Sequence, residues 1–103
     1  MAEKKLTISI ADSGRVILVG DITHKTVMSV LNKNVFNAKS QVIVDFAGVL
    51  RSDSSGLALM TRWARQAKKS NVEIYYECVP EKLAALAKMS GLDTILSISA
   101  KES

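Results

Sequence analysis

The residues with the most evident chemistry form the run Asp53–Leu57, which reads Asp-Ser-Ser-Gly-Leu. An apolar run, Val42–Val44, precedes it, and a helix-forming segment that ends near Lys69 begins with it. A serine hydroxyl at a helix start can accept a hydrogen bond from an early helix amide and so cap the helix. The same position favours an added phosphate, because free amides and the positive end of the helix dipole attract anions. Ser54 is therefore predicted to be a cap, a phosphorylation switch, or both.

The neighbours of Ser54 have several roles open to them. Asp53 is expected to orient the serine hydroxyl, to act electrostatically on a partner, or to be the N-cap itself. Ser55 is expected to have a turn role. Gly56 either lets a partner approach the helix closely or relieves crowding against the preceding loop. A phosphate on Ser54 would place about two negative charges on an exposed corner and would repel or reshape a docked partner.

The helix that follows carries a candidate docking surface. Four apolar residues at helical spacing are assigned to its core stripe: Leu57, Met60, Ala64 and Ala67. Leu59 and Trp63 then fall at the flank of that stripe, where Trp63 is either partly buried packing or an interface anchor. Arg62 lies beside Trp63 and belongs to another residue type that is enriched in interfaces. The predicted partner-binding residues are Asp53, Ser54, Ser55, Gly56, Leu59, Arg62 and Trp63.

Composition and motif content argue against several other functions. The 103 residues fit one small domain, 1–103, and a net charge of +4 spread among acidic residues, with few aromatic side chains, does not favour nucleic-acid binding. One histidine, His24, and one cysteine, Cys78, do not make a metal cluster, and Cys78 is expected to be a small buried residue rather than a reactive thiol. The sequence has neither a G-x-S-x-G elbow nor a phosphate-binding glycine loop. We therefore predict no enzyme activity, no cofactor and no metal.

Location follows from the same reading of the sequence. No apolar stretch approaches the roughly 20 residues needed to cross a bilayer. The N-terminus also lacks the apolar run of a signal peptide. The protein is therefore expected in the cytoplasm, without direct membrane insertion, or at the inner face of the inner membrane through a partner.

The hydrophobic periodicity predicts an α/β domain of order β-β-α-β-α-β-α with a short final strand or strand-like tail. The first two strands should form an antiparallel hairpin, and the strand 41–46 should be central and buried on both faces. A loop is predicted over 47–52. The remaining expected elements are strands over 6–10, 15–20 and 72–78, helices from Thr23 to about Asn37, from the serine motif to near Lys69 and from Pro80 to Gly91, a last strand over 95–98, and a frayed end over 99–103.

The run Asp53–Leu57 resembles the D-S-S-G-L motif at the start of the second helix of the STAS domain (sulfate transporter and anti-sigma factor antagonist). Weaker similarity lies in Leu18–Thr23 and Lys88–Leu92. The resemblance covers essentially the whole chain and implies a small mixed sheet with helices mainly on one face. In anti-sigma factor antagonists the first serine after the aspartate is phosphorylated by the partner kinase, and by the motif that serine is Ser54 here.

Two kinds of STAS protein fit the sequence. One is the accessory subunit of the bacterial lipid-asymmetry (Mla) transporter, which the chain resembles in length and in the start of its third helix, Val79–Leu83 followed by Ala84–Lys88. That subunit docks on the cytoplasmic ATPase of an ABC transporter and supports its assembly or activity. The other is the anti-sigma factor antagonist, which Met89–Leu92 and the intact serine motif resemble more. The resemblance to the transporter subunit is preferred, and the anti-sigma factor kinase is the alternative partner.

Overall fold

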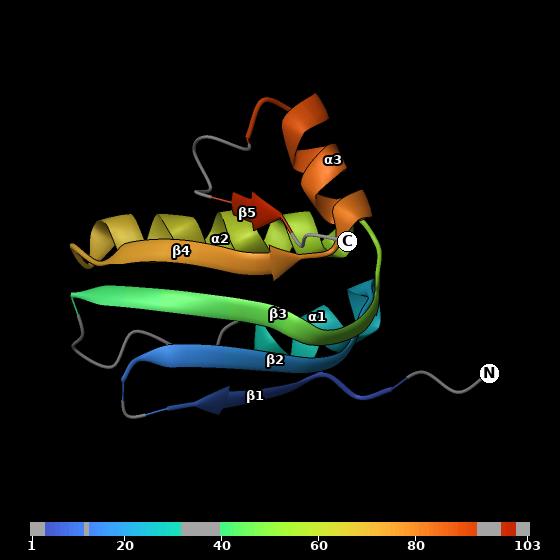
Figure 1. Ribbon diagram of the computed structural model, residues 1–103, viewed down its shortest axis with the longest axis horizontal. Coiled ribbons are helices and arrows are strands. Elements are labelled where there is room, and N and C mark those ends of the chain that lie inside the picture. The colour runs from blue at the N-terminus through green and yellow to red at the C-terminus, as the bar shows by residue number, and fades with distance from the viewer. Residues whose placement is uncertain (1–3, 12, 32–39, 93–97, 101–103) are drawn as a thin grey trace.

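The computed structural model describes residues 4–11, 13–31, 40–92 and 98–100. In these ranges five strands and three helices alternate in the order shown in Figure 1. The strands are β1 (Thr7–Ile10), β2 (Arg15–Ile22), β3 (Gln41–Ser52), β4 (Glu73–Val79) and β5 (Ile98–Ala100), and the helices are α1 (His24–Val30), α2 (Ser55–Lys69) and α3 (Glu81–Met89). No helix within the described ranges is both long and apolar enough to cross a membrane.

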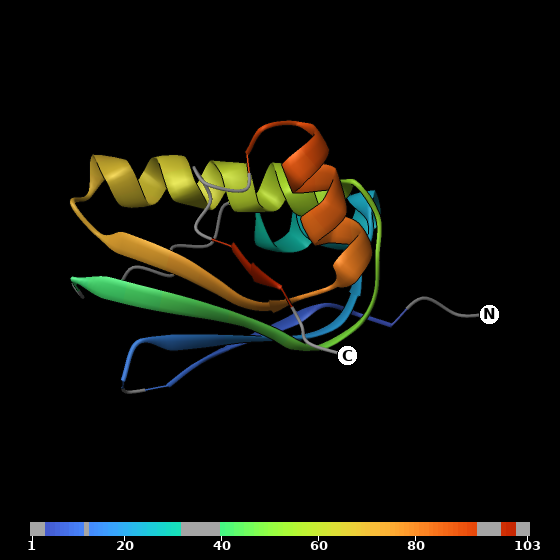
Figure 2. The same cartoon turned by 45° about the horizontal axis from the view of Figure 1, so that its top comes forward.

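The five strands form one mixed sheet whose spatial order follows the chain, β1-β2-β3-β4-β5. β1 and β2 are antiparallel, whereas β2, β3, β4 and β5 are mutually parallel. Figure 2 shows the three helices on one side of the sheet. The predicted α/β class, the first hairpin and the helices on one face are therefore confirmed.

β3 is twice as long as the sequence predicted. The segment 47–52, expected to be a loop, continues the strand and pairs in parallel with β2 up to Ile22 and Ser52. The register shifts twice along this pair, and these irregularities interrupt the simple alternation that identifies a strand in a sequence. Gly48 permits the close approach, because a Cβ there would lie 2.8 Å from the carbonyl oxygen of Leu18.

The sequence predicted that the central strand is buried on both faces. In the structure only one of its faces is buried. Val42 and Val44 face the helices and are buried, but Asp45 on the other face is only half-buried. Arg15 crosses this open face and makes salt bridges of 2.7 Å to Glu77 and 3.1 Å to Asp45. Hydrogen bonds, first to Glu77 and then to Asp45, raise the pKa of the Arg15 guanidinium. The apolar run Val42–Val44 in β3 thus places residues on one buried face and on one partly open face.

The core lies between the sheet and α2, and the helix presents a different stripe from the predicted one. Met60 and Ala67 are buried as expected, but Leu57 and Ala64 are only half-buried. The buried residues of α2 are Gly56, Leu59, Met60, Trp63 and Ala67. They meet buried side chains of the sheet, among them Val16, Leu18, Val42, Val44, Phe46 and Tyr76. The helix is therefore rotated so that Leu59 and Trp63 are fully buried, whereas Leu57 and Ala64 are not.

Several local signals in the sequence are confirmed. The Thr23 hydroxyl accepts from the Thr26 amide at 3.3 Å and caps α1 within a capping box. Gly14 has a φ of 90° in the first hairpin, and Gly91 has a φ of 72° after α3. The Leu92 amide donates to the Ala87 carbonyl oxygen at 2.8 Å, which closes the end of α3.

Two predictions lie partly outside the described residues, and two others are corrected. α1 ends at Val30, and the predicted continuation to about Asn37 lies outside the described residues. Most of the predicted last strand, 95–97, lies outside them as well. The strand found is β5, so the expectation of fraying was wrong for residues 99–100. Pro80 precedes α3 as its N-cap residue instead of being its first helical residue.

Candidate functional site

The serine motif lies where β2 and β3 end side by side. Ile22 pairs with Ser52, and the Asp53 amide donates to the Ile22 carbonyl oxygen at 3.0 Å. The chain then turns directly into α2, because the Gly56 amide donates to the Asp53 carbonyl oxygen at 3.0 Å. Two parallel strand ends therefore hold the start of α2 in place, and Asp53 and Ser54 are both exposed there.

The side chain that caps α2 belongs to Asp53 and not to Ser54. An oxygen of the Asp53 carboxylate, Oδ1, accepts from the Ser55 amide at 2.8 Å. Ser54 occupies the N-cap position, but its backbone is already helical, with φ −61° and ψ −15°, and within the described ranges its hydroxyl makes no capping hydrogen bond. The structure thus separates the two roles that the sequence left open for Ser54. The hydroxyl is exposed at the positive end of a 15-residue helix.

Gly56 faces the interior of the domain. It is buried, and a Cβ at this position would lie 2.7 Å from Cδ2 of Leu83 and 3.4 Å from Cγ2 of Ile22. The missing side chain therefore lets α3 and the end of β2 approach the start of α2. Gly56 is therefore not at the surface, where a partner could approach it closely, and the crowding it relieves comes from Leu83 rather than from the preceding loop. Ser55 is half-buried beside it.

Leu59 and Trp63 are core residues. The sequence placed them at the flank of the core with too few neighbours, whereas both are 0% exposed. The predicted position at the flank of the core is therefore wrong, and neither side chain is accessible at the surface in this structure. The Trp63 indole nitrogen, Nε1, is buried without a hydrogen-bond partner among the described residues. Arg62, which lies between them in the sequence, is exposed as predicted.

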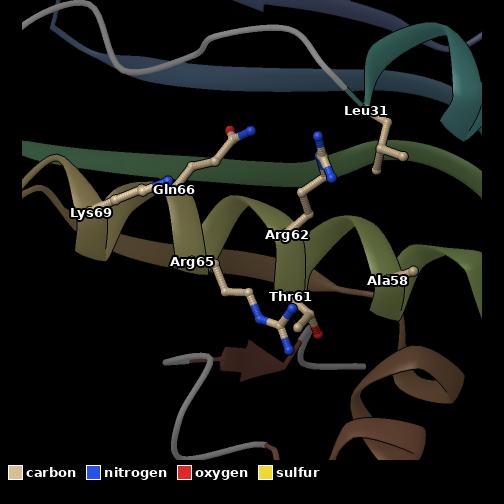
Figure 3. A pocket seen from close by; sticks show the side chains of 7 residues that line it. All are labelled: Leu31, Ala58, Thr61, Arg62, Arg65, Gln66 and Lys69. Carbon is tan, nitrogen blue, oxygen red and sulfur yellow. The ribbon is translucent and has the colours of Figure 1, made fainter.

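The exposed side of α2 is strongly basic. The helix carries Arg62, Arg65, Lys68 and Lys69 and has no acidic residue in its sequence. A groove of about 600 Å³ runs along this side, and Figure 3 shows the seven residues that line it. The lining consists of Leu31, Ala58, Thr61, Arg62, Arg65, Gln66 and Lys69. Among the predicted contacts, Asp53, Ser54 and Arg62 therefore remain at the surface.

Sequence reasoning missed a buried carboxylate beside the motif. Asp21 is 2% exposed, and its Oδ2 atom accepts from the Lys4 backbone amide at 3.0 Å. The guanidinium of Arg51, which precedes the motif, lies 3.8 Å from the same oxygen. An acidic residue directly after the apolar run of β2 was the available signal. Asp21 fixes the N-terminal segment against the strand ends that carry the motif.

The described residues contain no group of three or more His, Cys, Asp or Glu side chains that could hold a metal ion. Cys78 is half-buried at the end of β4, which is more open than the sequence suggested. The site as described is a surface of hydroxyl, carboxylate and cationic groups around one helix. Such an arrangement can bind a protein surface or accept a phosphate, and it includes no nucleophile paired with a base.

Comparison with known proteins agrees with this architecture. A family model described as "Mlab, STAS domain" matches residues 7–97. Among solved structures, the chain is similar to one titled "Structure of the Anti-Sigma Factor Antagonist SpoIIAA in its Unphosphorylated Form". That similarity has a TM-score of 0.72 at 16% sequence identity, and it covers 95% of this chain and 89% of the other. No curated protein matches the chain. Because the family model spans most of the sequence, the chain belongs to the STAS domain family.

Proposed function

We propose that this STAS domain is a non-catalytic docking subunit that binds the cytoplasmic ATPase of an Mla-type phospholipid ABC transporter and supports its assembly or activity. The observation that carries the proposal is the match of residues 7–97 to a family whose description includes the name Mlab. The exposed corner of Asp53 and Ser54 supports a docking role, because it is held rigidly by strand ends and leaves its polar groups available.

The docking surface in this proposal is smaller than the set predicted from the sequence. Asp53, Ser54 and Arg62 provide exposed groups, and Ser55 is partly accessible. Gly56, Leu59 and Trp63 act indirectly, by fixing the position of α2 against the sheet and α3. The partner would hold the protein at the inner face of the membrane.

The experiment is reconstitution from purified components. The full chain is mixed with the Mla-type ATPase and permease of the same organism, and complex formation is measured by size-exclusion chromatography with light scattering. The proposal expects co-elution with the ATPase and a change in its ATP hydrolysis rate. Absence of a complex with a folded, active ATPase would contradict the proposal.

A second function is favoured by one specific observation. The Ser54 hydroxyl is exposed and does not cap the helix, so phosphorylation would cost no capping bond. An anti-sigma factor antagonist regulated by phosphorylation of Ser54 would use this feature. Incubation with an anti-sigma factor kinase encoded nearby and ATP, followed by intact mass measurement, tests it: the alternative requires the mass of one phosphate, lost in Ser54→Ala.

A further inference from the structure

The exposed groups of α2 form one continuous row. Ser54, Ala58, Arg62, Arg65 and Lys69 are all exposed and follow one another at intervals of three or four helix positions. Residues at such spacings share one side of a helix. From Ala58 to Lys69 the row spans about 16 Å along the axis at 1.5 Å per residue. The serine motif is therefore the beginning of a longer surface.

The chemistry of this row changes from one end to the other. Its first part is apolar, since Ala58 lies in the same groove as Leu31 of the segment after α1. Figure 3 shows Arg62 extending toward the side of Leu31 and Arg65 extending to the opposite side of the helix. Lys69 follows at the far end. The groove therefore has a small apolar hollow at one end and cations on both sides beyond it.

Two cations of this row, Arg65 and Lys69, are exposed and available to a partner. In the part of the chain that the structure describes, neither Arg65 nor Lys69 forms a salt bridge. Since α2 contains no Asp or Glu, its own neighbours along the helix do not neutralise them. A concentration of positive charge in a groove attracts carboxylates and steers their approach.

We propose that the groove of α2 binds an acidic segment of the protein partner, with an apolar side chain over Ala58 and Leu31 and carboxylates over Arg65 and Lys69. This inference rests on the proposed docking function and names the chemistry of the surface that is docked. A protein segment fits better than a lipid headgroup layer, because a segment can lie in a groove of about 600 Å³ and a flat membrane surface cannot.

The charge of the row also predicts whether phosphorylation of Ser54 strengthens or weakens docking. Ser54 begins the row, one helical turn before Ala58, so a phosphate on Ser54 would face the same partner segment. An acidic partner would be repelled by that added charge. A basic partner would instead be attracted by the phosphate. Because the basic groove favours an acidic partner, phosphorylation of Ser54 is expected to weaken docking.

The test uses the full chain and a synthetic helical peptide with one leucine followed by glutamates at i+4 and i+7. A matched peptide carries glutamines in place of the glutamates. Titration is followed by amide NMR shifts of the labelled protein. We expect the glutamate peptide to shift the amides of the groove and to bind roughly ten times more tightly than the glutamine peptide, with an affinity that falls as salt rises.

Two double variants with the same change in net charge separate the groove from general electrostatics. Arg65→Glu with Lys69→Glu alters the groove, and Lys25→Glu with Lys88→Glu alters exposed positions on α1 and α3. The first pair is expected to weaken glutamate-peptide binding about tenfold, and the second to leave it within about twofold. Equal losses in both pairs, or equal binding of the two peptides, would overturn the inference.

Two further measurements identify the occupant. The first is binding to phosphatidylglycerol vesicles. If the unaltered chain binds the vesicles, the variant Arg65→Glu with Lys69→Glu does not, and the glutamate peptide does not bind, then the groove is a lipid site and the inference is overturned. The same variants are then titrated with the ATPase. If the groove variants bind the ATPase as tightly as the unaltered chain does, the inference about the groove is contradicted and the proposed docking function is not. Failure of the unaltered chain to dock would contradict the proposed function, while the peptide titration would still decide the chemistry of the groove.

Discussion

Oδ1 of the Asp53 carboxylate accepts a 2.8 Å hydrogen bond from the Ser55 amide, and the serine between them is left without a capping role. The polar side chains at the start of α2 are therefore divided between one that holds the helix and one that is free for a partner or a kinase. This division makes stability and docking separable by mutation.

Substitutions at these two residues should differ in their effect on stability. Asp53→Ala removes the side chain that caps α2 and is expected to lower the free energy of unfolding by about 1 kcal/mol. Ser54→Ala removes an exposed hydroxyl without a capping bond and should change it by less than about 0.5 kcal/mol. Urea denaturation followed by circular dichroism measures both values. A larger loss for Ser54→Ala than for Asp53→Ala would show that the serine is the cap after all.

Trp63 should behave as a core residue. Trp63→Ala is expected to lower the free energy of unfolding by about 4 kcal/mol, because the side chain is 0% exposed and its removal leaves a cavity. Fluorescence provides a second readout, since Trp63 is the one tryptophan in the sequence. The emission of the free protein should already be blue-shifted and should stay unchanged at saturation with a partner that lacks tryptophan. A blue shift on binding would instead restore Trp63 to the interface.

Gly56 should not tolerate a branched side chain. Gly56→Val is expected to destabilise the protein by about 2 kcal/mol, because even a Cβ would come within 2.7 Å of the buried Leu83 side chain. Ala58→Val places the same side chain on the exposed side of the same helix and controls for helix propensity. Thermal melting of both variants is sufficient. Similar melting temperatures would mean that Leu83 moves aside at little cost.

The Tyr76 hydroxyl links the sheet to the helix and makes stability dependent on pH. It donates to the Met60 carbonyl oxygen at 2.6 Å, and burial raises the pKa of Tyr76 above its ordinary value. A raised pKa in the folded state means that the stabilisation is present below the unfolded pKa, about 10, and is lost as the pH rises above it. At pH 11 the loss should be about 1.4 kcal/mol relative to pH 8.

The matched variant for this prediction is Tyr76→Phe. It should cost about 1 kcal/mol at pH 8 through the lost hydrogen bond and should then lack the extra loss at high pH. All other side chains are the same in both proteins, so the difference between the two curves is the measured quantity. Parallel curves would indicate that the phenol does not control the alkaline limit.

The fold was predictable where local chemistry decides the structure. Thr23 caps α1, Gly91 takes the left-handed conformation that ends α3, and the serine motif opens α2, each from signals within a few residues. The second half of β3 was missed because its pairing with β2 is non-local and irregular. A run that contains Gly48 and ends at Ser52 resembles a loop until the neighbouring strand is known.

The candidate site was predictable in position but not in orientation. The apolar residues of α2 cover a wide arc, so the sequence permits one stripe through Leu57 and Ala64 and another through Leu59 and Trp63. Packing selects the second stripe, because burying a tryptophan and a leucine removes more apolar surface from water than burying an alanine and a leucine. The role of Asp21 could not be predicted, because its partner, the Lys4 amide, is 17 residues away in the sequence and lies beside it only through the pairing of the first two strands.

The most direct measurement is the affinity of the ATPase for three forms of the full chain: unaltered, Ser54→Ala and Ser54→Glu. Isothermal titration gives the affinities, and the melting temperature of each form confirms folding. We expect all three forms to melt alike, Ser54→Ala to bind within about threefold of the unaltered chain, and Ser54→Glu to bind at least about tenfold more weakly. Equal affinities for all three forms would contradict the claim that the partner docks over the start of α2.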